Sequence, residues 1–376
     1  MPITRLLIED FITLAKQHPV FDVRSEGEFQ HACFPGAHSL PLFNNEERKV
    51  VGTAYKQESK QKAIKLGLEY FGPKMVKMVE EVESVLDSKQ MTVNGKMNGK
   101  KENKPVEITD KTVLVYCWRG GMRSAGVAWL LDLYGFKVYT LVGGYKSYRT
   151  WVLKQFEKEY PFKIIGGYTG SGKTEVLHAL REQGEAIIDF EGLACHKGSA
   201  FGNLGQPKQP KQEMFENLLA NALSVVSEKN STIWLEDESQ RIGEVNIPIT
   251  LFKFMRTCRV YFLDIPFEER LKYIVTAYGK FKKEDLINAT VRIQKRLGGL
   301  EAKTAVNYLI ENDLHGAFGV LLHYYDRFYT KSMNNMRENP EMVFKKISLE
   351  TVDMIANAKK VLAVYQQDMP VSSTSL

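Results

Sequence analysis

Residues 112–124, Thr-Val-Leu-Val-Tyr-Cys-Trp-Arg-Gly-Gly-Met-Arg-Ser, join an apolar run to a glycine pair flanked by arginines. The apolar run predicts a buried strand, and the residues from Ser124 onward follow a helical period, so Cys117 falls on a strand-to-helix loop. Gly120 and Gly121 allow backbone N–H groups to converge on the sulfur, and the positive end of the following helix adds to them. Because these features favour the thiolate, we predict that Cys117 is a nucleophile rather than an inert buried thiol.

The predicted active-site loop comprises Cys117 and the residues Trp118, Arg119, Gly120, Gly121, Met122 and Arg123. Arg119 and Arg123 are expected to add positive charge beside the sulfur. Cys117 and Arg123 also have the Cys-x5-Arg spacing of phosphate-binding phosphatases, so a phosphatase-like domain remains an alternative. Against it, Tyr116 stands where such phosphatases commonly carry His.

A second motif follows the apolar segment 162–166. Gly167-x-x-x-x-Gly172-Lys173-Thr174 lies between a predicted strand and a predicted helix, which is the context of a phosphate-binding P-loop. The backbone N–H groups of such a loop surround a phosphate, Lys173 supplies a positive charge, and Thr174 is a candidate magnesium ligand. The predicted diphosphate-binding residues are Gly167, Gly170, Ser171, Gly172, Lys173 and Thr174.

Further short apolar runs, at 186–191, 231–239 and 260–264, alternate with helical segments and predict a parallel, helix-flanked sheet. The run at 231–239 ends in carboxylates. Glu236 and Asp237 are the candidate acid or magnesium ligands there, and a solvated acidic turn is the alternative. The loop 196–207 is rich in Gly and contains Phe201, and a long loop of this kind is expected to be either functional or a connector.

The composition excludes several classes of protein. The chain has 376 residues and a net charge of +6, and its four Cys show neither a Cys-x-x-Cys pair nor zinc-ligand spacing. No membrane-spanning or export segment is apparent, so we expect a cytoplasmic protein with no certain metal site. Part of the positive charge lies in residues 89–104, with five Lys and one Glu, which are typical of a solvated loop insertion. Net charge therefore supports nucleic-acid binding only weakly.

The N-terminal residues carry a resemblance to a known domain. Asp22-Val23-Arg24-Ser25, Phe34-Pro35-Gly36-Ala37-His38 and the Cys117 loop, in this order, resemble the rhodanese sulfurtransferase domain. The resemblance implies that Cys117 carries a persulfide-like group and that Asp22 and Arg24 support the active-site loop.

The whole chain resembles the bacterial tRNA 2-selenouridine synthase family. The residues that carry this likeness are the two motifs above, the linker 143–149, Trp234 to Ser239, and stretches such as Gly52 to Gln57 and Leu322 to Asp326. The family implies replacement of sulfur by selenium in 2-thiouridine at wobble position 34 of tRNAs for Lys, Glu and Gln. It further implies S-geranylation from geranyl diphosphate, then selenation from selenophosphate through a Cys-bound selenium. No tightly bound cofactor is expected, magnesium is a candidate, and the enzyme that supplies selenophosphate is a candidate partner.

Whether the P-loop binds geranyl diphosphate, a nucleotide or both is left open by the sequence. An ATP-dependent P-loop kinase or binding module with a phosphatase-like or inactive rhodanese domain is the alternative function. For tRNA contacts, single-stranded loops are usually bound by aromatic stacking and by Arg or Lys. The candidates are Tyr145, Lys146, Tyr148, Arg149 and Phe201, and packing of the two Tyr side chains is the alternative.

The expected fold is α/β, with a rhodanese-like domain, a P-loop parallel-sheet domain and an α-helical C-terminal part. The predicted boundaries are 1–150 with a loop insertion at about 88–106, 151–285, 286–365, and a disordered tail at 366–376.

Overall fold

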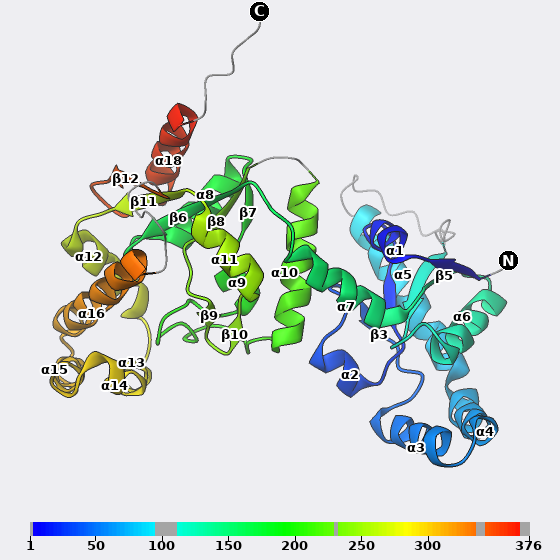
Figure 1. Cartoon of the computed structure of the whole chain (residues 1–376). Helices are drawn as coiled ribbons and strands as arrows, with labels where there is room; N and C mark the ends of the chain where they lie inside the picture. Colours follow the sequence, from blue (N-terminus) through cyan, green and yellow to red (C-terminus); the bar gives the residue numbers. More distant parts are fainter. Residues whose placement is uncertain (1–2, 95–110, 229–231, 336–342, 369–376) are drawn as a thin grey trace, which may run out of the picture. The chain divides into compact units, whose positions relative to one another are not determined.

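The computed structural model describes residues 3–94, 111–228, 232–335 and 343–368. The chain divides into two compact units, Met1–Lys154 and Gln155–Leu376, called here the first and second units. Each unit contains a five-stranded sheet whose strands pair in parallel, with helices packed around it (Figure 1). The predicted α/β class is therefore confirmed. Among the helices in the described ranges, none is long and apolar enough to cross a membrane.

The strands of the first unit lie in the order β1-β5-β4-β2-β3. Its elements are β1 (Thr4–Leu6), α1 (Ile8–Ala15), β2 (Val20–Asp22), α2 (Glu26–His31), β3 (His38–Ser39), α3 (Asn45–Gln57), α4 (Lys60–Phe71), the 3-10 turn Gly72–Lys74, α5 (Met75–Asn94), β4 (Thr112–Tyr116), α6 (Met122–Tyr134), β5 (Lys137–Leu141) and α7 (Gly144–Gln155). All five residues of the central strand β4 are buried, as its apolar run predicts.

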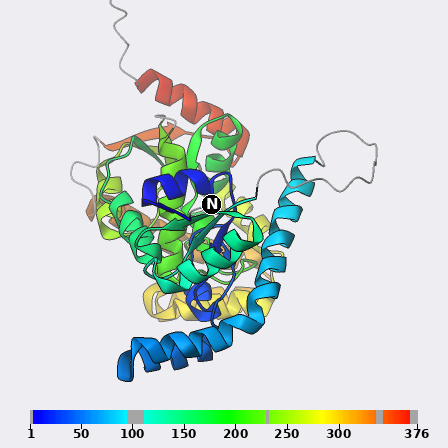
Figure 2. The same cartoon turned by 90° about the vertical axis from the view of Figure 1, so that its right-hand side faces the viewer.

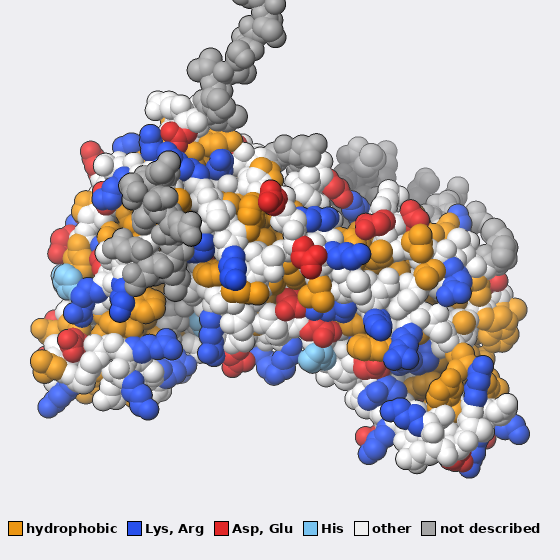
Figure 3. Space-filling model, viewed as in Figure 1, with side chains coloured by type: hydrophobic (Ala, Val, Ile, Leu, Met, Phe, Trp, Pro, Cys, Tyr) orange, Lys and Arg blue, Asp and Glu red, His pale blue; other side chains and the backbone are white. Residues whose placement is uncertain are grey.

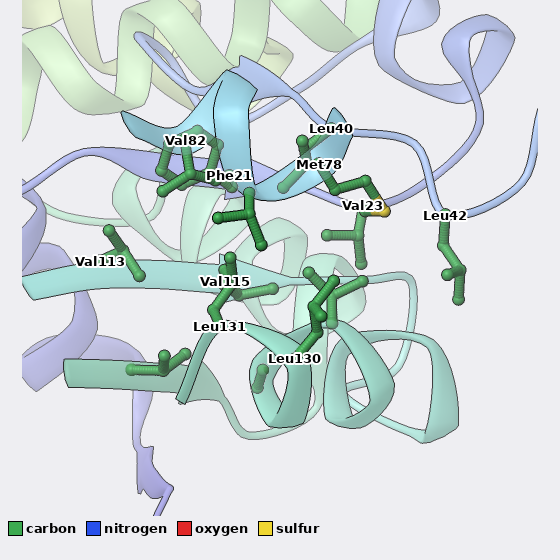
Figure 4. Close-up of a cluster of buried hydrophobic side chains, with 14 of the residues drawn as sticks. Phe21, Val23, Leu40, Leu42, Met78, Val82, Val113, Val115, Leu130 and Leu131 are labelled. Carbon is green, nitrogen blue, oxygen red and sulfur yellow. The ribbon is translucent and has the colours of Figure 1, made fainter. Parts of the chain in front are cut away.

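The core of the first unit forms between this sheet and the helices α5 and α6. Figure 4 shows side chains from β2 and β4, such as Phe21 and Val115, facing Met78 of α5 and Leu131 of α6. Burial of such apolar side chains is the main stabilising contribution to a fold of this size. Because β2 and β4 run parallel, their carboxyl ends lie at one edge of the sheet, where Asp22 pairs in register with Tyr116.

Some local predictions for the first unit are wrong. The apolar spacing from Leu6 to Leu14 predicts a helix over residues 6–18, but Leu6 belongs to the edge strand β1 beside β5, and α1 begins only at Ile8. Helix α5 continues to Asn94, so the first part of the predicted insertion 88–106 is helical, and Figure 2 shows the length of this helix. The rest of the insertion, from residue 95, lies outside the described residues.

The second unit has a sheet in the order β12-β11-β6-β8-β7 and a small antiparallel pair, β9 and β10. Its elements are β6 (Phe162–Gly167), α8 (Lys173–Glu182), β7 (Ala186–Ile188), α9 (Phe190–Ala194), α10 (Gln212–Ser227), β8 (Ile233–Glu236), β9 (Arg241–Ile242), β10 (Val245–Asn246), α11 (Ile249–Thr257), β11 (Val260–Asp264), α12 (Phe267–Tyr278), α13 (Lys283–Arg292), α14 (Gln294–Leu297), α15 (Gly299–Ile310), α16 (Leu314–Asn335), β12 (Phe344–Ser348) and α18 (Met354–Asp368). The P-loop strand β6 is central, between β11 and β8.

The C-terminal part differs from the prediction in composition and in extent. The expected helices are present as α13 to α16, and Figure 1 shows them grouped with α12 beside the sheet. However, β12 adds to the sheet in parallel with β11, so the segment 286–365 is not all helical. Helix α18 packs against α8 and continues to Asp368, which pairs with Arg259 and Lys345. The predicted tail is therefore helical up to this residue, and its remainder, 369–376, lies outside the described residues.

Candidate active sites

Cys117 lies directly after β4, on a loop that is hydrogen-bonded to the start of α7. The backbone N–H of Tyr145 donates to the Cys117 carbonyl oxygen at 2.8 Å, and that of Lys146 donates to the Trp118 carbonyl oxygen at 3.1 Å. Gly120 has a φ of +64°, and a Cβ atom there would lie 2.5 Å from the Leu141 carbonyl oxygen. Gly144 has a φ of +61°, and a Cβ atom there would lie even closer to the Cys117 carbonyl oxygen. Glycine is required at both positions, so the Gly-Gly turn after β5 fixes the shape of the Cys loop.

The sulfur of Cys117 is almost fully buried and is surrounded by hydrogen-bond donors. Its Sγ lies 3.2 Å from the Ser124 hydroxyl oxygen. Burial alone would raise the pKa of the thiol, but hydrogen bonds from the Ser124 hydroxyl and from backbone N–H groups of Ser124, Arg119 and Gly121 outweigh it. The pKa of Cys117 therefore lies below its ordinary value. In contrast, burial raises the pKa of Cys33 to about 11, so the two buried thiols differ in reactivity.

Ser124 is a functional residue that the sequence analysis missed as a site residue. It was identified only as the first residue of the helical period, although its position in the first turn of α6 directs its hydroxyl toward the preceding loop. Arg123 was predicted to add positive charge beside the Cys117 sulfur, but its side chain contacts Glu28. Its guanidinium donates to Glu28 Oε2 at 3.1 Å, so that carboxylate offsets much of its charge. The donors that lower the pKa of Cys117 are neutral backbone and hydroxyl groups.

Asp22 and Arg24 form a buried support behind the Cys loop. Arg24 Nη2 lies 2.6 Å from Asp22 Oδ2, and the Tyr116 hydroxyl donates to the same oxygen at 2.7 Å. The guanidinium of Arg24 lies 3.8 Å from the centre of the Tyr145 ring, which fits a cation–π contact. This network connects the end of β2, the end of β4 and the start of α7. Asp22 and Arg24 are thus buried and linked to the residues that flank the Cys loop, and their role in supporting an active site stays a prediction.

The aromatic side chains proposed to stack on tRNA bases are buried. Tyr145, Tyr148 and Phe201 expose 0%, 1% and 4% of their surface, respectively. Tyr145 packs under Arg24, and Tyr148 packs against Phe34 and Trp151. Burial therefore leaves none of the three rings exposed for stacking on RNA in this structure, and the two Tyr pack against residues of the first unit. Lys146 is exposed and Arg149 is half-buried, so their predicted contact with tRNA stays a prediction.

On the face seen in Figure 3, charge does not single out an RNA-binding patch either. Figure 3 shows Lys and Arg side chains spread over both units on the face viewed, interspersed with Asp and Glu. A phosphate-binding surface therefore has to be identified from particular residues.

In the second unit, the P-loop connects β6 to α8, as predicted. Gly170 and Gly172 have φ angles of +83° and +69°, and a Cβ atom on Gly170 would lie 2.7 Å from Ile274 Cδ1. The motif thus requires glycine both for its backbone conformation and for its contact with α12. Lys173 Nζ donates to the Gly167 carbonyl oxygen at 3.0 Å, which places the ammonium group along the loop.

The P-loop is supported by a buried ion pair that sequence reasoning did not identify. Arg270 of α12 forms two hydrogen bonds to the Asp326 carboxylate, at 2.9 and 2.7 Å, and donates to the Thr169 carbonyl oxygen at 3.0 Å. These contacts join α12 and α16 to the P-loop. In the sequence, Asp326 ends the stretch 322–326 that resembles the family. Its partner Arg270 could not be identified from the sequence, because it lies 56 residues away in the chain.

A cluster of three carboxylates lies beside the hydroxyl of Thr174. Glu191, Glu236 and Glu238 have oxygens within 4.8 Å of one another, and the Thr174 hydroxyl lies 3.0 Å from Glu191 Oε2 and 2.7 Å from Glu236 Oε2. Burial raises the pKa of all three. Repulsion raises it further, from Glu236 and Glu238 at Glu191, from Glu238 and Asp189 at Glu236, and from Asp237 at Glu238. Carboxylate and hydroxyl oxygens are ligands that magnesium prefers, and a divalent cation would relieve this repulsion. The residues present therefore fit a magnesium ion.

Of the two predicted acidic residues, only Glu236 lies in this cluster. Asp237 instead pairs with Arg256 at 2.8 Å and accepts a hydrogen bond from the Tyr329 hydroxyl at 2.6 Å. Glu191 follows β7 and Glu238 follows β8. Both belong to acidic stretches at the ends of predicted strands, but neither was among the predicted ligands.

The P-loop opens into a cavity of about 400 Å³. Residues 169–175 line it together with the charged side chains of Glu191, Lys197, Asp237, Glu238 and Arg256. Aromatic and aliphatic side chains, mainly from α12 and α16, also line it: Tyr273, Ile274, Tyr278, Tyr325, Phe328 and Tyr329. This combination can hold a molecule with a phosphorylated end and an apolar body.

Comparison with known proteins covers both units. A model of the tRNA 2-selenouridine synthase AAA domain matches residues 160–361, and a model of the rhodanese-like domain matches residues 77–150. The tRNA 2-selenouridine synthase of Hydrogenovibrio crunogenus (strain DSM 25203 / XCL-2) is 36% identical over 306 residues, with 76% of this chain and 77% of that protein covered. The corresponding protein of Pseudomonas syringae pv. syringae (strain B728a) is 33% identical over 351 residues, with 83% and 87% covered.

A solved N-terminal domain of an ATP/GTP-binding protein from Clostridium difficile 630 is also similar. It is 33% identical, covers 40% of this chain and 99% of its own, and has a TM-score of 0.31, which is too low to bear on the fold.

Proposed function

Since this chain belongs to the tRNA 2-selenouridine synthase family, we propose that it converts 2-thiouridine at wobble position 34 of tRNAs for Lys, Glu and Gln into 2-selenouridine, in the cytoplasm. The observation that carries the proposal is the presence, in one chain, of a thiolate-stabilising Cys loop and a P-loop that opens into an apolar cavity. The first suits the handling of an anionic chalcogen atom, and the second suits a lipid diphosphate.

The first half-reaction is geranylation. The thiocarbonyl sulfur of 2-thiouridine attacks C1 of geranyl diphosphate, the C1–O bond breaks, diphosphate leaves, and N3 of the base loses a proton. The P-loop N–H groups and Lys173 would bind the diphosphate, and the aromatic wall of the cavity would bind the hydrocarbon. A magnesium ion held by Thr174, Glu236, Glu191 and Glu238 would offset the charge of the leaving diphosphate.

The second half-reaction is selenation. Its overall balance is S-geranyl-2-thiouridine plus selenophosphate and water giving 2-selenouridine, geranylthiol and phosphate. Alkylation turns the ring sulfur into a good leaving group, so selenium can replace it at C2. The donors around Cys117 Sγ would also hold a terminal selenium bonded to that sulfur, which supports Cys117 as a carrier of selenium. Because selenophosphate contains selenium at the selenide level, formation of this S–Se bond passes two electrons to an oxidant such as a disulfide, and a thiol returns them when selenide is transferred to C2 and geranylthiol leaves.

The test is mass spectrometry of nucleosides from 2-thiouridine-containing tRNA incubated with the protein, magnesium, geranyl diphosphate and selenophosphate. We expect S-geranyl-2-thiouridine when selenophosphate is omitted and 2-selenouridine when both substrates are present. If neither nucleoside forms with the folded protein, the proposed function is wrong.

A nucleotide is the second candidate ligand of the P-loop, because Thr174 and the Glu236 cluster lie where a nucleotide-bound magnesium would be held. An ATPase assay with and without tRNA distinguishes the two ligands. ATP turnover that depends on tRNA, together with no use of geranyl diphosphate, would favour the nucleotide.

A further inference from the structure

Beyond the large cavity, the second unit contains a smaller void of about 30 Å³. Among the residues that border both spaces are Ile274, Tyr278 and Tyr325. The far side of the void is formed by Phe201, Phe318, Leu321 and Leu322. None of its described lining residues is charged, although Thr169 of the P-loop and Ser199 border both spaces, so the void adjoins the P-loop through uncharged residues.

Helix α12 runs from the P-loop toward this void. Ile274 approaches the P-loop, because a Cβ atom on Gly170 would lie within 3 Å of its side chain. Tyr278 follows one turn later on the same face of α12, about 6 Å farther along the helix. A hydrocarbon chain that starts at a diphosphate in the P-loop and follows this face therefore meets Tyr278 after Ile274.

The side chain of Tyr278 borders both spaces. The centre of its ring lies 5.8 Å from that of Phe201 and 5.9 Å from that of Phe318, both of which line the void. Phe201 is held in place by its loop, since its backbone N–H donates to the Ser199 hydroxyl at 3.2 Å and the Ala200 N–H donates to the Tyr325 hydroxyl. The space behind Tyr278 is thus small, apolar and bounded by a fixed wall.

We propose that Tyr278 determines the length of the prenyl chain that this enzyme transfers, by closing the apolar end of the cavity to a chain longer than geranyl. The inference rests on the proposed function, because it assigns a specificity residue to the same prenyl diphosphate site. Replacement of Tyr278 by Ala removes six carbons and one oxygen and joins the void to the cavity. An additional isoprene unit has five carbons, so the enlarged site accommodates farnesyl diphosphate, and binding of its additional hydrocarbon is favourable in an apolar pocket.

The experiment is a competition. Equimolar geranyl and farnesyl diphosphate are supplied with 2-thiouridine-containing tRNA and magnesium, without selenophosphate, and the ratio of the two S-prenyl nucleosides is measured by mass spectrometry. A ratio is independent of the amount of active enzyme. We expect the wild type to transfer mainly geranyl and Tyr278→Ala to shift the ratio toward farnesyl by about 10-fold or more, which is the range for hydrocarbon discrimination in apolar pockets.

Three variants serve as controls. Tyr278→Phe keeps the ring and should keep the wild-type ratio. Phe281→Ala removes a ring from the same helical core, 6.0 Å from Tyr278, without lining either space, and should also keep the ratio. Tyr278→Leu is the milder enlargement to be used if Tyr278→Ala does not fold, and its ratio should shift in the same direction.

The possible outcomes distinguish the role of Tyr278 in chain length from the proposed prenyl transfer itself. A wild-type ratio in folded Tyr278→Ala or Tyr278→Leu, or an equal shift in Phe281→Ala, overturns the role of Tyr278 while leaving prenyl transfer intact. If the wild type binds inorganic diphosphate but transfers neither prenyl group, the proposed function fails and the specificity assignment fails with it.

Discussion

Individual side chains determine the reactivity of the two chemical sites. Cys117 and Cys33 are both buried, yet the pKa of Cys117 is lowered and that of Cys33 is raised. Burial raises the pKa of Cys33 and the Asp22 carboxylate raises it further, whereas at Cys117 the effect of burial is outweighed by hydrogen bonds from Ser124 and from the loop before α6. The nature of the neighbouring polar groups therefore outweighs burial in deciding which thiol reacts.

Replacing Cys117 by Ser should abolish 2-selenouridine formation while S-geranyl-2-thiouridine still forms, because the P-loop site lies in the other unit. The nucleosides are measured by mass spectrometry after incubation with both substrates. Cys33→Ser is the matched control and should keep both activities. Wild-type selenation by Cys117→Ser would show that this thiol does not carry selenium.

Replacing Ser124 by Ala should raise the pKa of Cys117. Loss of one hydrogen bond to a charged group costs about 1.5–3 kcal/mol, which corresponds to a shift of about 1–2 pH units. The rate of iodoacetamide alkylation at Cys117, followed by peptide mass spectrometry across pH, should rise at a higher pH than in the wild type. Ser124→Thr retains a hydroxyl and should have a smaller effect. An unchanged pH profile in Ser124→Ala would mean that the backbone donors alone stabilise the thiolate.

Strand ends and helix starts bring the reacting groups together. In the first unit, β2, β4 and the start of α7 meet at one edge of the sheet, so that Arg24, Tyr116 and Tyr145 support the Cys loop. In the second unit, the P-loop follows β6, while Glu191 follows β7 and Glu236 ends β8. Both sites thus use the carboxyl edge of a parallel sheet, where the connecting loops are free to carry functional groups.

Replacing Lys173 by Ala should weaken binding of geranyl diphosphate by about 10- to 100-fold, because a charge-assisted hydrogen bond to the diphosphate is lost. Geranylation should fall accordingly, whereas selenation of tRNA that is already geranylated should change little. Isothermal titration with geranyl diphosphate and single-turnover assays of each half-reaction measure the two effects. The control is Lys253→Ala, an exposed residue of α11. Equal loss of both half-reactions would indicate that Lys173 acts in tRNA binding or in coupling of the units instead.

At the scale of the whole molecule, the proposed function assigns two chemistries to one base. Under this proposal a tRNA has to present its wobble base to the prenyl site and to Cys117, and a modified base usually leaves its stack to enter such a site. With Tyr145, Tyr148 and Phe201 buried, the phosphate contacts predicted for Lys146 and Arg149 are the part of the original tRNA hypothesis that stands untested.

Charge reversal at Lys146 and Arg149 should weaken tRNA binding and reduce its dependence on salt. Each lost phosphate contact lowers the slope of log affinity against log salt concentration by about 0.7–0.9. Filter binding of tRNA between low and moderate salt measures this slope. Lys77→Glu reverses one charge at an exposed position of α5 and is the control for each single reversal. A wild-type slope in the double variant would exclude these residues from phosphate binding and direct attention to Lys295 and Arg296.

The sequence by itself determined the features that depend on contacts a few residues apart. The spacing Gly167 to Thr174 implied a P-loop, and the glycine pair after an apolar run implied a loop able to hold a thiolate at Cys117. These predictions succeed because backbone conformation and strand or helix period are local properties.

Only the tertiary structure decided which distant residues share a site. Strand order brings Glu191 to Glu236 and leaves Asp237 with Arg256, and parallel pairing with β11 makes a strand of residues 344–348. Packing also buries Tyr145 and Phe201, whose rings were predicted from the sequence to be exposed and to contact tRNA. No local pattern encodes these outcomes, because burial and ion pairing depend on neighbours that lie tens of residues away in the chain.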